Sequence, residues 1–141
     1  MLIDTDVLIW YMRGDPTAYQ RIEALQPKIQ LSAVTQMELL QGMRDKAELR
    51  AFEATTRRWQ ARLIPISESI SDRAVRLVRD YALSHGMRLG DALIAATALA
   101  LNEPLLTAND KHYRMINGLS LQHFRASSNE QREHPSDIHP K

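Results

Sequence analysis

Short apolar runs alternate along this chain with segments long enough for amphipathic helices, and this alternation constrains the fold most. The runs stand at residues 2–3, 29–32, 62–66, 104–107 and 119–121. Between them, hydrophobic spacing predicts helices over 7–14, 18–26, from 35, 47–61, 69–85 and 92–101. Such repeats form βαβ units, in which helices cover both faces of a mostly parallel sheet. We therefore predict an α/β fold.

Several residues predict where these elements begin and end. Asp6 is a candidate N-cap for the first helix, and Ser69 with Asp72 resembles a capping box at the start of a long helix. Gly86 follows that helix and predicts its C-terminal end. Pro65 cannot donate a backbone hydrogen bond, so the run 62–66 is expected near a sheet edge.

Composition narrows the class of protein. With 141 residues and no cysteine, the chain can bury a core without disulfides or thiolate metal sites. We expect one domain over residues 1–125 and a polar, disordered tail over 126–141. No run is long enough to span a membrane and the first residues do not resemble a signal peptide, so we expect a soluble cytoplasmic protein. A net charge of +1 does not by itself indicate a polyanionic partner.

Acidic residues recur at equivalent places in this pattern, directly after a strand or in the first turn of the next helix. They are Asp4, Glu38, Asp91 and Asp110. Because loops after parallel strands converge at one end of the sheet, we expect these carboxylates to meet there. Two carboxylates about 4 Å apart repel by about 4 kcal/mol at an effective dielectric near 20, so such a cluster needs protons or cations. The sequence thus predicts an all-oxygen site for Mg²⁺, with Mn²⁺ as an alternative.

Each acid also has an ordinary structural explanation. Asp4 can accept hydrogen bonds from the following turn, and Asp91 can cap a helix after Gly90. Glu38 stands three residues after Thr35, the spacing of a capping box, and Asp110 fits a polar turn. The case for a metal site therefore depends on the four positions together.

Basic residues are concentrated in one region, which suggests a phosphate-binding surface. They are Arg44, Lys46, Arg50, Arg57, Arg58 and Arg62. Contact with RNA, contact with a protein inhibitor and a solvated helix face all remain open for them. Arg88, near Asp91, is a further candidate for binding phosphate. Trp59 could stack a base, but it shares an apolar stripe with Phe52 and is better explained as core.

Four segments together resemble the PIN-domain ribonucleases, and in particular the toxin half of VapBC toxin–antitoxin pairs. They are residues 1–9 with Asp4, 34–42 with Glu38, 90–98 with Asp91 and 106–113 with Asp110. They stand in the order of that family and extend over residues 1 to about 124. The resemblance implies a three-layer α/β/α sandwich with a five-stranded parallel sheet. It also implies Mg²⁺- or Mn²⁺-dependent endoribonuclease activity, a small VapB-type antitoxin as partner, and a homodimer.

The same resemblance assigns roles to individual residues. Asp4, Glu38 and Asp91 match acidic metal ligands, whereas Thr5 and Thr107 match hydroxyls that support the site. Asp6 stands where many relatives have asparagine. The fourth acidic position varies among relatives, so the fourth ligand is open, and the candidates, all in the last segment, are Asn109, Asp110 and His112.

Two other functions would also place acids at the ends of parallel strands or use a PIN-like fold. A phosphorelay receiver also gathers acids around Mg²⁺, but the run 62–66 is followed by Ser67, where a phospho-accepting aspartate would be needed. A non-catalytic PIN-like module that binds RNA or a protein remains the alternative. Zinc is not indicated, because His85, His112 and His123 show no paired spacing.

Overall fold

Five short parallel strands form the centre of the protein. The computed structural model describes residues 1–127. Its strands are β1 (Leu2–Ile3), β2 (Gln30–Ser32), β3 (Arg62–Ile64), β4 (Leu105–Thr107) and β5 (Leu121–His123). They lie in the order β3-β2-β1-β4-β5, and each pair of neighbours is parallel. The predicted α/β class and five-stranded parallel sheet are confirmed, and β3 lies at an edge, as Pro65 indicated.

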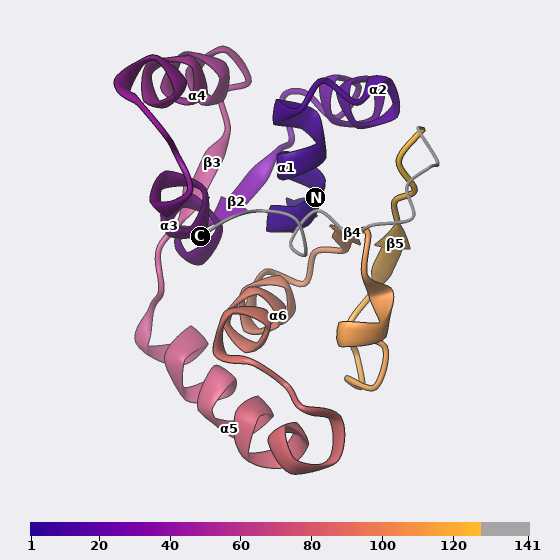
Figure 1. The fold of residues 1–141 in the computed structure, drawn as a ribbon. Helices are drawn as coiled ribbons and strands as arrows, with labels where there is room; N and C mark the ends of the chain where they lie inside the picture. The colour runs from indigo at the N-terminus through magenta and orange to yellow at the C-terminus, as the bar shows by residue number, and fades with distance from the viewer. Residues whose placement is uncertain (128–141) are drawn as a thin grey trace.

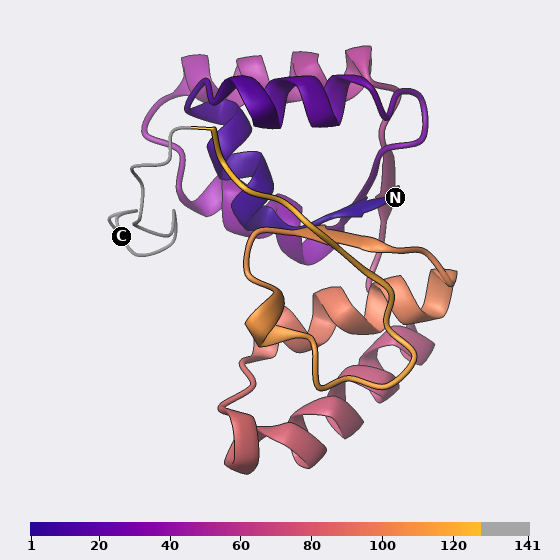
Figure 2. The same cartoon turned by 90° about the vertical axis from the view of Figure 1, so that its right-hand side faces the viewer.

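Helices cover both faces of this sheet, as the three-layer prediction requires. One layer holds α1 (Thr5–Met12), α2 (Pro16–Glu23) and α4 (Lys46–Arg58), and the other holds α5 (Glu68–His85) and α6 (Leu89–Leu101). Figure 1 labels these helices, and Figure 2 shows the two layers on opposite sides of the strands. The remaining helix, α3 (Ala33–Gln41), contacts both α1 and α6 and so connects the layers.

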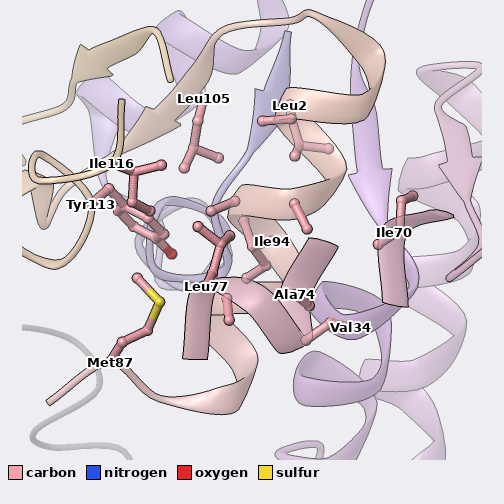
Figure 3. Packing of buried hydrophobic residues seen from close by; sticks show 14 of the residues in the cluster. Leu2, Val34, Ile70, Ala74, Leu77, Met87, Ile94, Leu105, Tyr113 and Ile116 are labelled. Atoms are coloured by element: carbon pink, nitrogen blue, oxygen red, sulfur yellow. The ribbon is translucent and has the colours of Figure 1, made fainter. Parts of the chain in front are cut away.

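Alternation along the strands divides the core in two. Leu2 and Leu105 face the α5–α6 layer, whereas Ile3 and Leu106 face the α1, α2 and α4 layer. All four side chains are fully buried, and each such burial stabilises the fold by about 1.5–3 kcal/mol. Figure 3 shows the first cluster, with Leu2 and Leu105 above Ile94 and Leu77. Trp59 lies in the second cluster with an exposed fraction of 1%, which confirms its interpretation as core.

Two helix starts differ from the predictions in a way that matters for the site. Asp4, not Asp6, is the N-cap of α1, because Asp4 still has the extended backbone of β1 and Asp6 already lies in the first turn. Helix α3 begins at Ala33 with Ser32 as its cap, two residues before Thr35. The capping-box explanation considered for Thr35 and Glu38 is therefore wrong, and the carboxylate of Glu38 accepts a hydrogen bond from Thr5 instead.

Helices α5 and α6 also begin at residues other than those predicted. Ser67, not Ser69, caps α5, because the backbone is still extended at Ser67 and its hydroxyl accepts from the amide of Ile70 at 3.2 Å. Gly86 ends α5 in the left-handed conformation with φ of 65°, as predicted. Arg88 is the N-cap residue of α6, so the N-cap role considered for Asp91 is wrong.

Other boundaries shift by a few residues. Helix α2 starts earlier than predicted because Asp15 caps it and Pro16 opens it, and α4 ends before the predicted limit at residue 61. The last strand lies two residues later than predicted. Residues 128–141 of the predicted tail lie outside the described residues, so the division at residue 125 stays a prediction. Within residues 1–127, no helix is long and apolar enough to cross a membrane.

Candidate active site

Asp4 lies at the centre of the sheet, where β1 ends and the strand order reverses. Its side chain is buried, with 5% of the residue exposed. The Oδ1 atom accepts a hydrogen bond from the Thr5 amide at 2.8 Å, and Oδ2 accepts one from the Thr107 hydroxyl at 2.7 Å. Thr107 is the last residue of β4, the neighbour of β1. This contact joins the carboxyl ends of the two central strands, where open α/β sheets bind ligands.

Glu38 reaches the same end of the sheet from α3. Its Oε1 atom accepts a hydrogen bond from the Thr5 hydroxyl at 2.6 Å, and Thr35 Oγ1 lies 2.9 Å from the same hydroxyl. A Cβ atom at Gly90 would lie only 2.8 Å from Glu38 Oε2. The absence of a side chain at residue 90 therefore allows the Glu38 carboxylate to lie against the start of α6.

Asp91 lies in the first turn of α6, next to that contact. Its Oδ1 atom accepts a hydrogen bond from the Tyr113 hydroxyl at 3.2 Å, and its Oδ2 atom lies 3.0 Å from Nδ1 of His112. Both donors follow β4 in the chain. Asp91 therefore connects α6 to the segment after the second central strand.

Asp6 is the fourth acid at this end of the sheet. It is 6% exposed, and its Oδ1 atom accepts from the Ala108 amide at 3.5 Å. Its charge raises the pKa of Asp4, of Glu38 and of Asp91. We use the name acidic cluster for the set Asp4, Asp6, Glu38 and Asp91.

The pKa values of this acidic cluster show a shortage of positive charge. Burial and then the charge of Asp6 raise the pKa of Asp4 well above its usual value, although the Thr107 hydrogen bond opposes this. Partial desolvation raises the pKa of Glu38 against the Thr5 hydrogen bond, even though that residue as a whole is exposed. Burial likewise raises the pKa of Asp91, while His112 lowers it. A cation in this space would favour the charged form of all three carboxylates.

The residues proposed for the fourth position are arranged differently. Asp110 lies in the short helix η1 (Asp110–His112), and its Oδ1 atom lies 3.8 Å from Nδ1 of His123 on β5. The side-chain amide of Asn109 lies 2.8 Å from Nε2 of His112, and the other ring nitrogen of His112 is the one that faces Asp91. Of these three, His112 is thus the residue that the structure brings into contact with the acidic cluster.

The arginines predicted to bind RNA do not form one group. Arg88 is exposed and lowers the pKa of Asp91 through its charge, which places it beside the acidic cluster.

The other arginines lie on or near α4. Arg44 pairs with Glu48 at 2.6 Å, and Arg58 pairs with Glu23 at 2.8 Å. Arg57 is exposed on α4. Arg58 therefore has a structural role that the sequence did not indicate.

Tyr113 and Thr35 contact the site, and neither was assigned a role there from the sequence. Tyr113 is 1% exposed, and burial together with the charges of Asp4 and Asp91 raises the pKa of its hydroxyl well above the usual value. It therefore stays a neutral hydrogen-bond donor. The available signal was a large aromatic residue in a polar stretch of the fourth segment, since an aromatic ring there tends to be buried and a buried phenol needs a polar partner.

The donor set fits a hard divalent cation in chemistry, although not as a closed cage. Carboxylate and hydroxyl oxygens are the ligands that Mg²⁺ and Mn²⁺ prefer. In the part of the chain that the structure describes, no three histidine, aspartate or glutamate side chains are already arranged to hold a metal ion. Mg²⁺ commonly uses one or two carboxylates and keeps several waters, and the acidic cluster can supply such an open site.

Comparisons with known proteins agree with this fold. The model of the PIN domain matches residues 1–118. Ribonuclease VapC19 of Mycobacterium tuberculosis is 37% identical over 121 residues, which is 82% of this chain and 93% of the relative. A chain in a toxin–antitoxin complex from Klebsiella pneumoniae is 32% identical with a TM-score of 0.67, over 84% of this chain and 93% of that one. In VapBC-1 from nontypeable Haemophilus influenzae, a chain is 27% identical with a TM-score of 0.71, over 86% of this chain and 96% of that one. The chain therefore belongs to the PIN-domain family and is related within it to the VapC ribonucleases.

Proposed function

We propose that this protein is a divalent-metal-dependent endoribonuclease and the toxin of a VapBC-type pair. The observation that carries the proposal is the acidic cluster, in which carboxylates from three distant segments meet at the carboxyl ends of the central strands. Burial, and to a smaller extent the charge of Asp6, raises the pKa of Asp4, of Glu38 and of Asp91 there. The kinship with ribonuclease VapC19 supports RNA as the substrate class. Mg²⁺ is the cofactor that fits, and Mn²⁺ can replace it.

Within this proposal, each residue of the site has a task. Asp4, Glu38 and Asp91 would hold the cation, directly or through its waters, and Asp6 adds negative charge to the same space. The hydroxyls of Thr5 and Thr107 orient the carboxylates of Glu38 and Asp4 through the hydrogen bonds described above. When bound, the cation supplies a water of lowered pKa and offsets negative charge on the phosphoryl group.

Arg88 is the first candidate to bind the phosphate, because its charge already lowers the pKa of Asp91. Arg57 is exposed and suits a contact farther along an RNA backbone. Arg44 is exposed as well, but it would have to exchange its pair with Glu48 for a phosphate. Arg58 contributes less, since its guanidinium is engaged by Glu23.

Asp110 keeps a place in the proposal only as a residue at the margin of the site. Its contact with His123 points it toward β5, whereas His112 faces Asp91 directly. Replacing Asp110 with asparagine is therefore expected to reduce RNA cleavage less than Asp91→Asn does.

The partners follow from the same kinship. We propose a small VapB-type antitoxin that inhibits the nuclease, assembly as a homodimer, and action in the cytoplasm, with which a chain without cysteine agrees. A small upstream reading frame that encodes a DNA-binding fold would support the toxin assignment. Co-expression of both reading frames should restore growth to cells that the protein alone arrests.

The decisive experiment compares RNA cleavage by the wild type, Asp4→Asn and Asp80→Asn. Asp80 is a matched control, because its side chain is 55% exposed on α5 and pairs with Arg79 at 3.5 Å. We expect total RNA to be cut with Mg²⁺ and not with EDTA, a loss of at least about 100-fold in Asp4→Asn, and full activity in Asp80→Asn. Cleavage that persists in EDTA or in Asp4→Asn would refute the assignment. Specific RNA binding without any cleavage would instead favour the non-catalytic module.

A further inference from the structure

The acidic cluster has a neutral group between two of its members, the hydroxyl of Tyr113. Tyr113 directly follows η1, and its ring is buried in the α5–α6 cluster with Ile116 and Leu105. Figure 3 shows this ring beside Ile116, with the hydroxyl oxygen in red at its end. The position of the oxygen is therefore determined by the packing of a large rigid side chain.

This hydroxyl contacts two carboxylates that lie far apart in the sequence. Its oxygen lies 3.2 Å from Oδ1 of Asp91. Asp4 is the second carboxylate beside it, because a side-chain hydrogen bond between the two lowers the pKa of Asp4 and raises that of Tyr113. One phenol has one hydrogen, so it cannot donate fully to both carboxylates at once. The hydroxyl thus lies between Asp4 and Asp91 as a shared donor.

The other donors described above serve one carboxylate each. Asp4 receives hydrogen bonds from Thr5 and Thr107, and Asp91 faces His112. A phenylalanine ring would fill the same apolar space without bringing a polar atom into it. Because a buried hydroxyl is costly unless it is hydrogen bonded, its contacts with both acids compensate for its burial.

We propose that Tyr113 is a positioning residue whose hydroxyl bridges Asp4 and Asp91 and keeps both carboxylates facing the same divalent cation. The inference rests on the proposed metal-dependent function and deepens it. Groups that orient metal ligands typically change metal affinity or activity by roughly 10- to 100-fold when they are removed. The loss expected for Tyr113→Phe lies in that range.

The test measures binding of Mn²⁺ alone to the full chain, by the electron paramagnetic resonance signal of free Mn²⁺, beside RNA cleavage and the melting temperature without metal. The variants are Tyr113→Phe, Asp4→Asn and the control Tyr81→Phe. Tyr81 packs against the same apolar cluster from α5, where its ring meets that of His85. We expect Tyr113→Phe to raise the Kd for Mn²⁺ by roughly 10- to 100-fold, and Tyr81→Phe to leave it unchanged.

The outcomes separate this inference from the function on which it rests. If Asp4→Asn loses Mn²⁺ while Tyr113→Phe binds it within about twofold of the wild type, the function stands and the role of Tyr113 is refuted. The role is also refuted if Tyr113→Phe changes the melting temperature and the Kd no more than Tyr81→Phe does. If the wild type does not bind Mn²⁺, or Asp4→Asn binds it equally well, the proposed metal centre itself fails.

Discussion

The carboxylate of Glu23 is the centre of a polar network that joins α2 to α1 and α4. It accepts hydrogen bonds from the Tyr11 hydroxyl at 2.5 Å, from two guanidinium nitrogens of Arg58 at 2.9 and 2.8 Å, and from the Trp59 indole at 3.2 Å. The Glu23 side chain is only 17% exposed. Replacing Glu23 with glutamine keeps its size and removes its charge, which tests how much this network stabilises the fold.

The pKa of Glu23 indicates how much stability the Glu23→Gln change should remove. The hydrogen bond from Arg58 is the largest cause that lowers this pKa from 4.5 to about 2. One pKa unit corresponds to about 1.4 kcal/mol, so the full difference would be about 3 kcal/mol. Because half of the Arg58 side chain is exposed and water screens the pair, we expect about 1–2 kcal/mol. A lowered pKa means that this stability is present above about pH 4.5 and is lost as the pH falls toward 2.

Urea unfolding near pH 7 and near pH 2.5 measures this directly. The Glu23→Gln variant should be less stable than the wild type by about 1–2 kcal/mol near pH 7, and the difference should largely disappear near pH 2.5. Glu53→Gln is the control, since Glu53 is exposed on α4 and should show no such difference. Equal losses at both pH values, or no loss near pH 7, would refute the reasoning.

Two further predictions concern the acidic cluster. Gly90→Ala would place a Cβ atom 2.8 Å from Glu38 Oε2, the end of a flexible side chain. The fold should change in stability by less than about 1 kcal/mol in urea unfolding while RNA cleavage falls, and unchanged cleavage would separate Glu38 from the chemistry. Burial raises the pKa of Asp4, Glu38 and Asp91, so the metal-free protein should lose stability as the pH rises and these groups ionise. Mg²⁺ at about 100 times its Kd should restore about 2.7 kcal/mol, with a larger gain in melting temperature near pH 7 than near pH 5, and equal gains would contradict this.

The sequence by itself determined the class of fold and the places where the acids stand. Short apolar strands that alternate with amphipathic helices are buried best in a parallel sheet with helices on both faces. Each apolar run forms a strand within a few residues of its predicted place. Asp4 and Asp91 could be located because a residue at a strand end or in a first helical turn has a known direction relative to the sheet.

Tertiary structure decided which of these residues bond one another. Whether Asp4 or Asp6 caps α1 depends on where the extended backbone of β1 ends, and propensity does not distinguish two aspartates two residues apart. The hydrogen bond from Thr107 to Asp4 exists because β4 pairs with β1 in one register, which no local pattern encodes. The contact of Arg58 with Glu23 and that of Tyr113 with Asp91 likewise join residues from different elements. Only the packing of whole layers brings such pairs within hydrogen-bond distance.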